Sequence, residues 1–358
     1  MRPTYNIPDL PLSYNFATVP VFQALNAASR ALAELKGTAR TIPNEQVLIN
    51  TLTIREAQDS SAVENIITTQ DELFRAEIAL SERHSPATKE VQRYAVALRQ
   101  GFVDVKSTGL ITRPHIIKIQ EELERNRAGI RTSPGTKLEN DKTGEVVYVP
   151  PQHPDEINRH LDGLVRYLND DQLCSLDPLI KMAIIHHQFE SIHPFYDGNG
   201  RTGRIINILY LVQQGLLELP ILYLSRYIIA HKEDYYRLLQ AVRDRGEWED
   251  WVVYILRGIE ETAKQSIFLI SQIRTAMQQV KRKLRQDHPK VYSQDLLNNL
   301  FRHPYTKIQV VAEDLNVHPL TARKYLSILT KTGILTEHKI GRDKYFVNDR
   351  LIDILAAG

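Results

Sequence analysis

The sequence predicts a mainly α-helical protein with two small β-hairpins, one near the middle of the chain and one near its C-terminus. Apolar residues recur at helical spacing over much of the chain, as in residues 21–35. Runs of β-branched and aromatic residues beside turn-forming residues occur at 135–151 and 334–347. The length of 358 residues suggests two or three structural units around a well-buried core.

The first 109 residues are predicted to form an N-terminal helical region. Residues 21–35 are rich in Ala and Leu, residues 44–67 continue the same apolar spacing, and Pro86 opens a further helix. Thr112, followed by Arg113 and Pro114, has the form of an N-cap at the start of the next helix. That helix begins a predicted central core of residues 110–260.

The central core contains the first predicted hairpin. Residues 142–145 give a turn signal, and residues 146–149 have the composition of a short strand. Helices are expected to resume from Pro154 onward. A long and increasingly charged stretch then predicts a linking helix over residues 261–286.

Residues 287–358 are predicted to form a separate C-terminal domain. Thr306 can cap a helix over residues 307–315, Asn316 begins a turn, and Pro319 can open a second helix before the hairpin at 334–347. This order resembles a winged helix-turn-helix, which binds either DNA or another protein. If it binds DNA, the residues expected to face the phosphate backbone are Arg323, Lys324, Arg342 and Lys344.

The charge distribution is consistent with a basic C-terminal domain. The net charge is only +2, but residues 281–350 contain 14 Lys and Arg against 7 Asp and Glu, a surplus of +7, which leaves −5 for the rest. The single cysteine, Cys174, excludes an intrachain disulfide and fits a reducing compartment. The N-terminus has no apolar run, and polar residues interrupt the most apolar stretch, 205–224. A cytoplasmic protein without a membrane partner is therefore expected.

Residues 193–204, His-Pro-Phe-Tyr-Asp-Gly-Asn-Gly-Arg-Thr-Gly-Arg, combine groups that suit phosphate chemistry. Glycines before a helix leave free backbone N–H groups that attract anions. Arg201 and Arg204 are three residues apart and offer two guanidinium groups to a polyphosphate. Asp197 suits Mg²⁺, and His193 can accept a proton near neutral pH. The alternative is a plain glycine-rich loop, because the Gly-Lys-Ser/Thr of a Walker P-loop is absent.

The same segment is similar to the Fic family signature, His-Pro-Phe-x-Asp/Glu-Gly-Asn-Gly-Arg-x-x-Arg, at every specified position. The resemblance covers roughly residues 110–260 and implies a helical Fic core. It also implies a protein adenylyltransferase that transfers AMP from ATP to a hydroxyl side chain of a target protein or of the chain itself.

The resemblance assigns roles to the motif residues. His193 would deprotonate the target Ser, Thr or Tyr, and Asp197 would hold Mg²⁺. The hairpin resembles the Fic flap, which would align the target by strand addition; an ordinary surface hairpin is the alternative. Tyr235 and Tyr236 lie where the family places a tyrosine over the base, although tyrosines at helical positions are often core residues. The residues expected to act at the nucleotide are Glu64, Val147, Tyr148, Gly198, Asn199, Gly200, Arg201, Thr202, Gly203, Arg204, Tyr235 and Tyr236.

Residues 60–65, Ser-Ser-Ala-Val-Glu-Asn, resemble the Fic inhibitory motif, Ser/Thr-x-x-x-Glu-Gly/Asn, through Ser60, Glu64 and Asn65. On a helix, Ser60 and Glu64 present one face. The resemblance implies that Glu64 pairs with Arg204 and keeps it from the γ-phosphate of ATP, and that Glu64 positions water for removal of AMP. An ordinary glutamate at a helix end is the alternative.

A function of another class also fits the sequence, namely a DNA-binding transcriptional regulator whose core only senses nucleotide. His193 favours the enzyme, because sensing alone needs no base. The family resemblance and the long helix before the last domain favour a homodimer. The target protein, the modified residue and the choice of base in the donor are not specified by the sequence.

Overall fold

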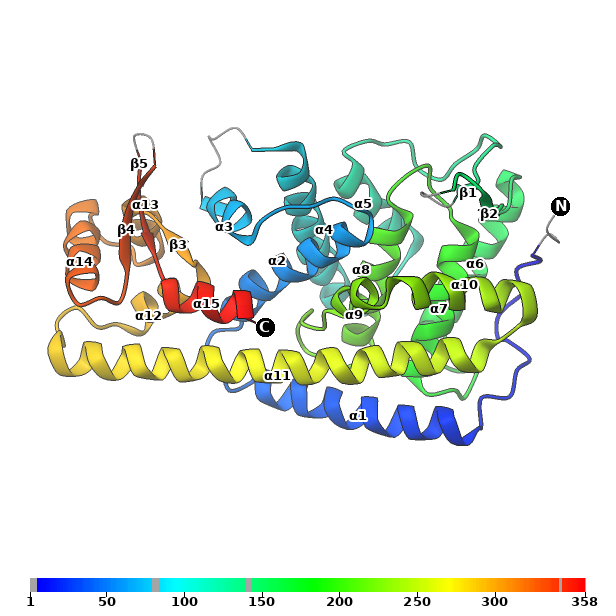
Figure 1. The fold of residues 1–358 in the computed structure, drawn as a ribbon, viewed down its shortest axis with the longest axis horizontal. Coiled ribbons are helices and arrows are strands. Elements are labelled where there is room, and N and C mark those ends of the chain that lie inside the picture. The colour runs from blue at the N-terminus through cyan, green and yellow to red at the C-terminus, as the bar shows by residue number, and fades with distance from the viewer. Residues whose placement is uncertain (1–4, 79–83, 140–142, 341–342, 358) are drawn as a thin grey trace.

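The computed structural model describes residues 5–78, 84–139, 143–340 and 343–357, and this part of the chain is mainly helical, as predicted (Figure 1). Two long helices, α1 (Val19–Ala39) and α11 (Trp248–Asp287), run side by side along one edge of the molecule (Figure 1). The predicted linking helix, residues 261–286, is the second half of α11. The expected boundary at residue 260 therefore falls inside a continuous helix.

The N-terminal region also contains α2 (Glu45–Val63), α3 (Gln70–Ile78) and α4 (Pro86–Thr108). Helix α2 ends earlier than the predicted 44–67. Glu64 has φ −95° and ψ 20°, and Asn65 follows with φ 63°. Asn tolerates the left-handed region better than most residues, so it ends the helix here. As a result, Glu64 lies immediately after the last residue of α2, at its C-cap position.

Helices α7 (Pro178–Ile192) and α8 (Asn199–Gln213) form the centre of the core. Nearly every residue of both helices is buried, as expected of helices that are surrounded on all sides. They pack against each other, and the motif segment, residues 193–204, forms the loop between them and the beginning of α8. Helices α4 and α5 (Arg113–Glu124) pack on α8, and α6 (Pro154–Asn169) and α11 pack on α7. The core also contains α9 (Leu224–Ala230), which contacts α2 and α11, and α10 (Lys232–Arg245), which bonds to α7 through Tyr235 and His186.

The predicted central hairpin is present. Strand β1 (Leu138–Glu139) pairs antiparallel with β2 (Val146–Tyr148), in the register Leu138 to Tyr148 and Glu139 to Val146. Thr112 caps α5 as predicted, because its hydroxyl accepts a hydrogen bond from the His115 N–H.

The C-terminal region contains α12 (Gln294–Arg302), α13 (Ile308–Asp314), α14 (Pro319–Lys331) and α15 (Asp349–Ala357). Three short strands, β3 (Tyr305–Thr306), β4 (Thr336–Ile340) and β5 (Asp343–Val347), form an antiparallel sheet in the order β3-β5-β4. The expected cap at Thr306 is wrong: Thr306 pairs with Phe346 in the sheet, and Lys307 occupies the N-cap position of α13. The winged-helix interpretation of these elements stays a prediction.

The C-terminal elements pack against the N-terminal region as well as against α11. Helix α12 contacts α2, β3 contacts α3, and α15 lies on α11 (Figure 1). The Tyr305 hydroxyl bonds to the Asp71 carboxylate, and the Gln70 amide donates to the Leu355 carbonyl over 3.3 Å. Both Asp71 and Gln70 belong to α3, the helix that follows Glu64 along the chain.

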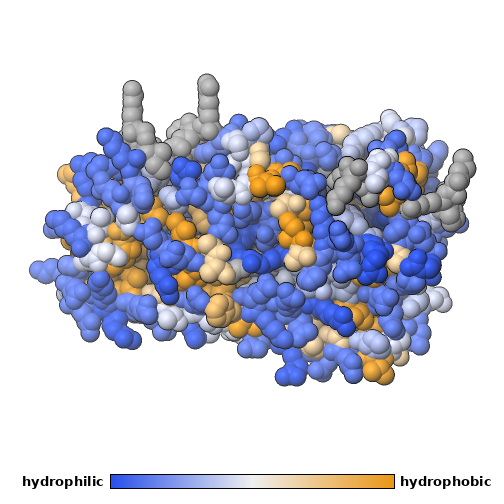
Figure 2. Space-filling model, in the orientation of Figure 1, coloured by the Kyte–Doolittle hydropathy of each residue, from blue (hydrophilic) through white to orange (hydrophobic). Residues whose placement is uncertain are grey.

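The surface in the view of Figure 1 is largely hydrophilic (Figure 2). Apolar side chains form several groups in this view, and one of them lies near the beginning of α1, where Val19 and Phe22 are exposed (Figure 2). Among the described residues, every helix is too short or too polar to cross a membrane.

Candidate active site

The loop between α7 and α8 places the candidate base. His193 follows the last residue of α7 and has φ 47° and ψ 60°, a left-handed conformation that turns the chain sharply. Its N–H still donates to the Phe189 carbonyl over 2.9 Å. Burial, and then the nearby cations Arg131 and Arg243, lower the pKa of His193 to about 3. The imidazole is therefore neutral at physiological pH, which is the form that a base requires, although the same burial and cations weaken its affinity for a proton.

Gly198 starts α8 and has φ 77°, which a side chain would make strained. A Cβ atom there would also lie 2.5 Å from Glu124 Oε1. The predicted glycine-led helix start is therefore present, with backbone N–H groups at the beginning of α8. The side chain of Asn199 stabilises the loop before this helix. Its amide oxygen accepts a hydrogen bond from the Phe195 N–H over 2.9 Å, and its amide nitrogen donates one to the Phe195 carbonyl over 2.8 Å.

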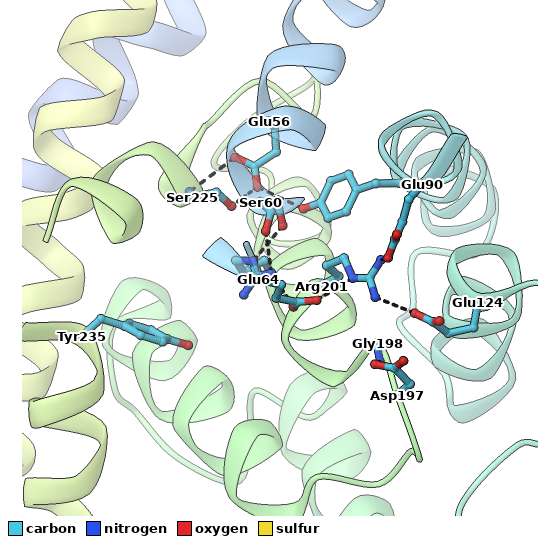
Figure 3. A network of polar contacts seen from close by, with 12 residues as sticks. Glu56, Ser60, Glu64, Glu90, Glu124, Asp197, Gly198, Arg201, Ser225 and Tyr235 are labelled. Carbon is cyan, nitrogen blue, oxygen red and sulfur yellow. Dashed lines mark hydrogen bonds and ion pairs between the residues drawn. The ribbon is translucent and has the colours of Figure 1, made fainter. Parts of the chain in front are cut away.

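Arg201 is buried on α8 among three carboxylates from three other parts of the chain (Figure 3). Its Nε lies 2.7 Å from Glu64 Oε2, and its Nη2 lies 2.8 Å from Glu124 Oε1. Glu90 pairs with its Nη1. Glu90 belongs to α4 and Glu124 to α5. These two glutamates were not found by sequence reasoning, because neither lies in a local motif and only the fold brings them to Arg201.

Arg204 is held by the end of α2. Its Nε donates to Ser60 Oγ over 2.7 Å, and its Nη2 donates to the Ser60 carbonyl over 2.9 Å and to Glu64 Oε1 over 2.8 Å. Burial alone would lower the pKa of Arg204, but Glu64 outweighs it and raises the pKa. Glu64 thus contacts both arginines, one with each carboxylate oxygen, whereas only the contact with Arg204 was expected.

The glycines of the motif allow these close approaches. A Cβ atom on Gly200 would lie 2.7 Å from Glu64 Oε1, and one on Gly203 would lie 2.7 Å from Glu190 Oε1. The Glu64 carboxylate therefore lies directly against the start of α8. Thr202 is buried, and its N–H donates to the Gly198 carbonyl within the first turn. Asn65 accepts a hydrogen bond from Lys232 Nζ over 3.1 Å, which ties the end of α2 to α10.

The remaining candidate residues belong to the hairpin and to α10. Tyr148 of the hairpin is buried, and its hydroxyl donates to the Ser191 carbonyl over 2.8 Å; Val147 beside it is half-buried. Tyr235 is buried, with its hydroxyl 2.9 Å from His186 Nε2, as the core alternative describes. Tyr236 is 49% exposed, so of the two tyrosines it is the one at the surface, and its contact with the nucleotide base stays a prediction.

Asn207 is a polar residue inside the otherwise apolar part of α8, where its amide could contact a nucleotide or satisfy a buried backbone group. The residue is buried on α8, and both polar atoms of its amide are without a hydrogen-bond partner among the described residues. Among the described residues, the Asn207 amide therefore satisfies no buried backbone group.

Asp197 is exposed on the loop, and one of its carboxylate oxygens accepts from the Gly198 N–H over 2.7 Å. Mg²⁺ is commonly held by one or two carboxylates together with substrate phosphates. A single exposed carboxylate beside a helix start that attracts phosphate fits this pattern. Within the described ranges, no group of three or more His, Cys, Asp or Glu side chains could hold a metal by itself.

A second buried network lies behind Ser60 (Figure 3). Glu56, one helical turn before Ser60, accepts from the Tyr94 hydroxyl over 3.0 Å and from the Ser225 hydroxyl. Burial raises the pKa of Glu56 to about 8, although the bond from Ser225 acts in the opposite direction. The spacing of Glu56, Ser60 and Glu64 on one helix face is a signal that sequence reasoning did not use.

Three protein families match consecutive parts of this chain. The Fic/DOC family N-terminal model matches residues 22–103, and the Fic/DOC family model matches residues 110–211 and so includes the whole motif. The chain belongs to the Fic/DOC family. A third match, protein adenylyltransferase SoFic-like, C-terminal domain, covers residues 276–351.

Curated relatives of this Fic chain are named protein adenylyltransferases. Protein adenylyltransferase fic-1 from Caenorhabditis elegans is 29% identical over 154 residues, which are 42% of this chain and 29% of the relative. Protein adenylyltransferase Fic from Drosophila grimshawi is 30% identical over 115 residues, 32% of this chain and 22% of the relative. The matches therefore span less than a third of the length of these relatives.

Solved structures share the Fic fold. A Fic family protein from Desulfovibrio desulfuricans G20 is 19% identical, has a TM-score of 0.60, and is matched over 93% of this chain and 97% of that one. Fic-1 from Caenorhabditis elegans is 21% identical, has a TM-score of 0.54, and is matched over 70% of this chain and 74% of that one.

Proposed function

We propose that this chain is a protein adenylyltransferase that transfers AMP from ATP to a Ser, Thr or Tyr hydroxyl of a target protein, and that Glu64 inhibits it. The observation that carries the proposal is the arrangement of one loop and one helix start. A neutral His193 lies at one end of the loop, and Arg201 and Arg204 lie on the first turns of the helix at the other end. The names of the relatives support the same activity.

The proposed reaction needs one base and a rigid phosphate site. His193 accepts the proton of the target hydroxyl, and that oxygen attacks the α-phosphorus of ATP. The bond between the α-phosphorus and the bridging oxygen of the β-phosphate breaks, and pyrophosphate leaves. The backbone N–H groups at the start of α8 and the two arginines stabilise the negative charge of the leaving group.

Asp197 would hold Mg²⁺ in this reaction, and the ion would neutralise charge on the phosphates when bound. The position of Asp197 next to Gly198 supports this role, because the Asp197 carboxylate lies beside the same helix start. The hairpin β1–β2 would bind an extended segment of the target by strand addition. Its exposed Val146 and the following Val149 offer an apolar surface for that segment.

Inhibition follows from competition for the same cations. The two oxygens of Glu64 are bound to Arg201 and Arg204, so neither guanidinium is free to take the terminal phosphates in a productive pose. We also propose that Glu64 can direct a water molecule to remove AMP from a modified target, since its carboxylate lies against Gly200 at the start of α8.

The experiment is labelling with [α-³²P]ATP and Mg²⁺, in the presence of a cell lysate as a source of targets. Three proteins are compared: wild type, Glu64→Gly, and Glu64→Gly with His193→Ala. We expect protein-bound label with Glu64→Gly only, on a target or on the chain itself. Label that persists without His193 would exclude His193 as the base, and absence of label from all three would contradict AMP transfer.

A further inference from the structure

Arg131 contacts the turn that carries the candidate base. It lies in the connection between α5 and β1, and its side chain is fully buried. Its Nε donates to the His193 carbonyl over 2.7 Å, and its Nη2 donates to the Ile192 carbonyl over 3.3 Å. Its own N–H donates to the Pro194 carbonyl over 2.9 Å. One residue thus binds three consecutive carbonyls around His193.

These carbonyls need such a partner. The last carbonyl groups of a helix have no N–H donor inside the helix, and burying a carbonyl without a hydrogen-bond donor costs free energy. The left-handed conformation of His193 is also unfavourable for a residue with a side chain. The planar guanidinium of Arg131 reaches two carbonyls at once, so it supports a backbone conformation that the local sequence does not favour.

The two residues after Arg131 hold the other end of the same loop. The N–H groups of Thr132 and Ser133 both donate to the Tyr196 hydroxyl, over 3.0 Å and 3.2 Å. Residues 131–133 therefore fix the backbone from Ile192 to Pro194 and the side chain of Tyr196. They lie five residues before β1, so the segment that would bind the target and the loop that carries the base share one connection.

We propose that Arg131 is a positioning residue, which holds His193 in the orientation required to accept the proton of the target hydroxyl. The proposal rests on the proposed function, in which His193 is the base. Arg131 acts through the backbone of His193, and within the described part of the chain it has no hydrogen bond to Arg201 or Arg204. Its loss should therefore slow the chemical step and leave the binding of Mg·ATP nearly unchanged.

The test compares Arg131→Met and Arg131→Lys, each in the Glu64→Gly background. Arg127→Met is the matched control, because Arg127 is an exposed arginine of the same connection, four residues earlier. We expect Arg131→Met to lower kcat for AMP transfer at least tenfold, because a displacement of about 1 Å can cost about a hundredfold. KM for Mg·ATP should stay within about threefold, as binding itself is untouched. Arg131→Lys should recover only part of kcat, since an ammonium lacks the two-pronged geometry, and Arg127→Met should match its parent.

A second readout needs no turnover. The imidazole C–H signal of His193 is assigned by NMR through its loss in His193→Ala, in protein with Glu64 intact. Arg131→Met should shift this signal, while the signal of His303 in the C-terminal region stays in place. An unchanged His193 signal, or an unchanged kcat in folded Arg131→Met, overturns the proposal. If Arg131→Met does not fold, an unchanged kcat in Arg131→Lys overturns it. If Glu64→Gly itself transfers no AMP, the proposed function fails, and the NMR result still decides whether Arg131 positions His193.

Discussion

Replacing Glu64 tests the proposal that its carboxylate restrains AMP transfer. Glu64→Gly removes both contacts, to Arg201 and to Arg204, whereas Glu64→Gln keeps the shape of the side chain and removes its charge. The two substitutions therefore separate the charge of Glu64 from its bulk. The distinction matters because Glu64 Oε1 also lies against Gly200, where it fills space near the helix start.

The expected magnitude follows from the two contacts. A hydrogen bond to a charged partner contributes about 1.5–3 kcal/mol. The side chain of Glu64 is 25% exposed, so the lower end applies. Two such contacts amount to about 3 kcal/mol, and 1.4 kcal/mol is a factor of about ten. Glu64→Gly should therefore raise the rate of AMP transfer about a hundredfold. Glu64→Gln, which retains a neutral acceptor, should raise it about tenfold.

The assay is the initial rate of label incorporation from [α-³²P]ATP at saturating Mg·ATP, with a fixed amount of lysate protein. Glu45→Gln is a suitable control, since Glu45 begins the same helix, far from the arginines in sequence. A Glu64→Gln rate equal to wild type, alongside a fast Glu64→Gly, would refute the reasoning, because inhibition would then depend on bulk and not on charge.

Two further predictions concern other parts of the molecule. Burial raises the pKa of Glu56 from its ordinary value of 4.5 to about 8. Between these two pH values the folded protein keeps a proton on Glu56 that the unfolded chain releases. The free energy of unfolding therefore falls as the pH rises from 4.5 to 8. Glu56→Gln removes this pH dependence. Relative to wild type, its free energy of unfolding, measured with urea, should rise by up to about 2 kcal/mol from pH 6 to pH 8. A difference between the two proteins that stays constant over this range would contradict the raised pKa of Glu56. In the C-terminal region, Arg323 and Lys324 are exposed on α14, Lys344 pairs with Glu337 in the sheet, and Arg342 lies outside the described residues. If this region binds duplex DNA, Arg323→Glu with Lys324→Glu should reduce the slope of log affinity against log salt by about 2, and binding that is absent or insensitive to salt would favour a protein partner.

The sequence predicted those features that depend on neighbouring residues. The helix start after Gly198 and the nearness of Ser60 to Glu64 follow from local spacing, whereas the role of His193 as the base stays a proposal. The pairing of Glu64 with Arg204 came from a family resemblance, since nothing in the spacing brings α2 to α8.

The features that the sequence did not predict depend on contacts between elements that are distant in the chain. Glu90 and Glu124 meet Arg201 only because α4 and α5 pack around α8. Tyr235 carries the same side chain as Tyr236, and only the packing of α10 decides which one is buried. The strand β3 was not predicted, because its two residues, Tyr305 and Thr306, are too few to show the alternation of apolar and polar residues that marks a strand.

The position of Glu64 at the end of α2 has a consequence for the speed of activation. Helix α2 is buried along most of its length, and the following α3 is bound to the C-terminal elements, so the backbone on both sides of Glu64 is fixed. The Glu64 side chain is 25% exposed, so the motion we expect to separate it from both arginines is rotation about its own side-chain bonds. Rotations of this kind take picoseconds to nanoseconds, whereas domain movements take microseconds to milliseconds. Under the proposed inhibition, release of Glu64 therefore requires no domain movement, and a partner that binds the released state would increase its population.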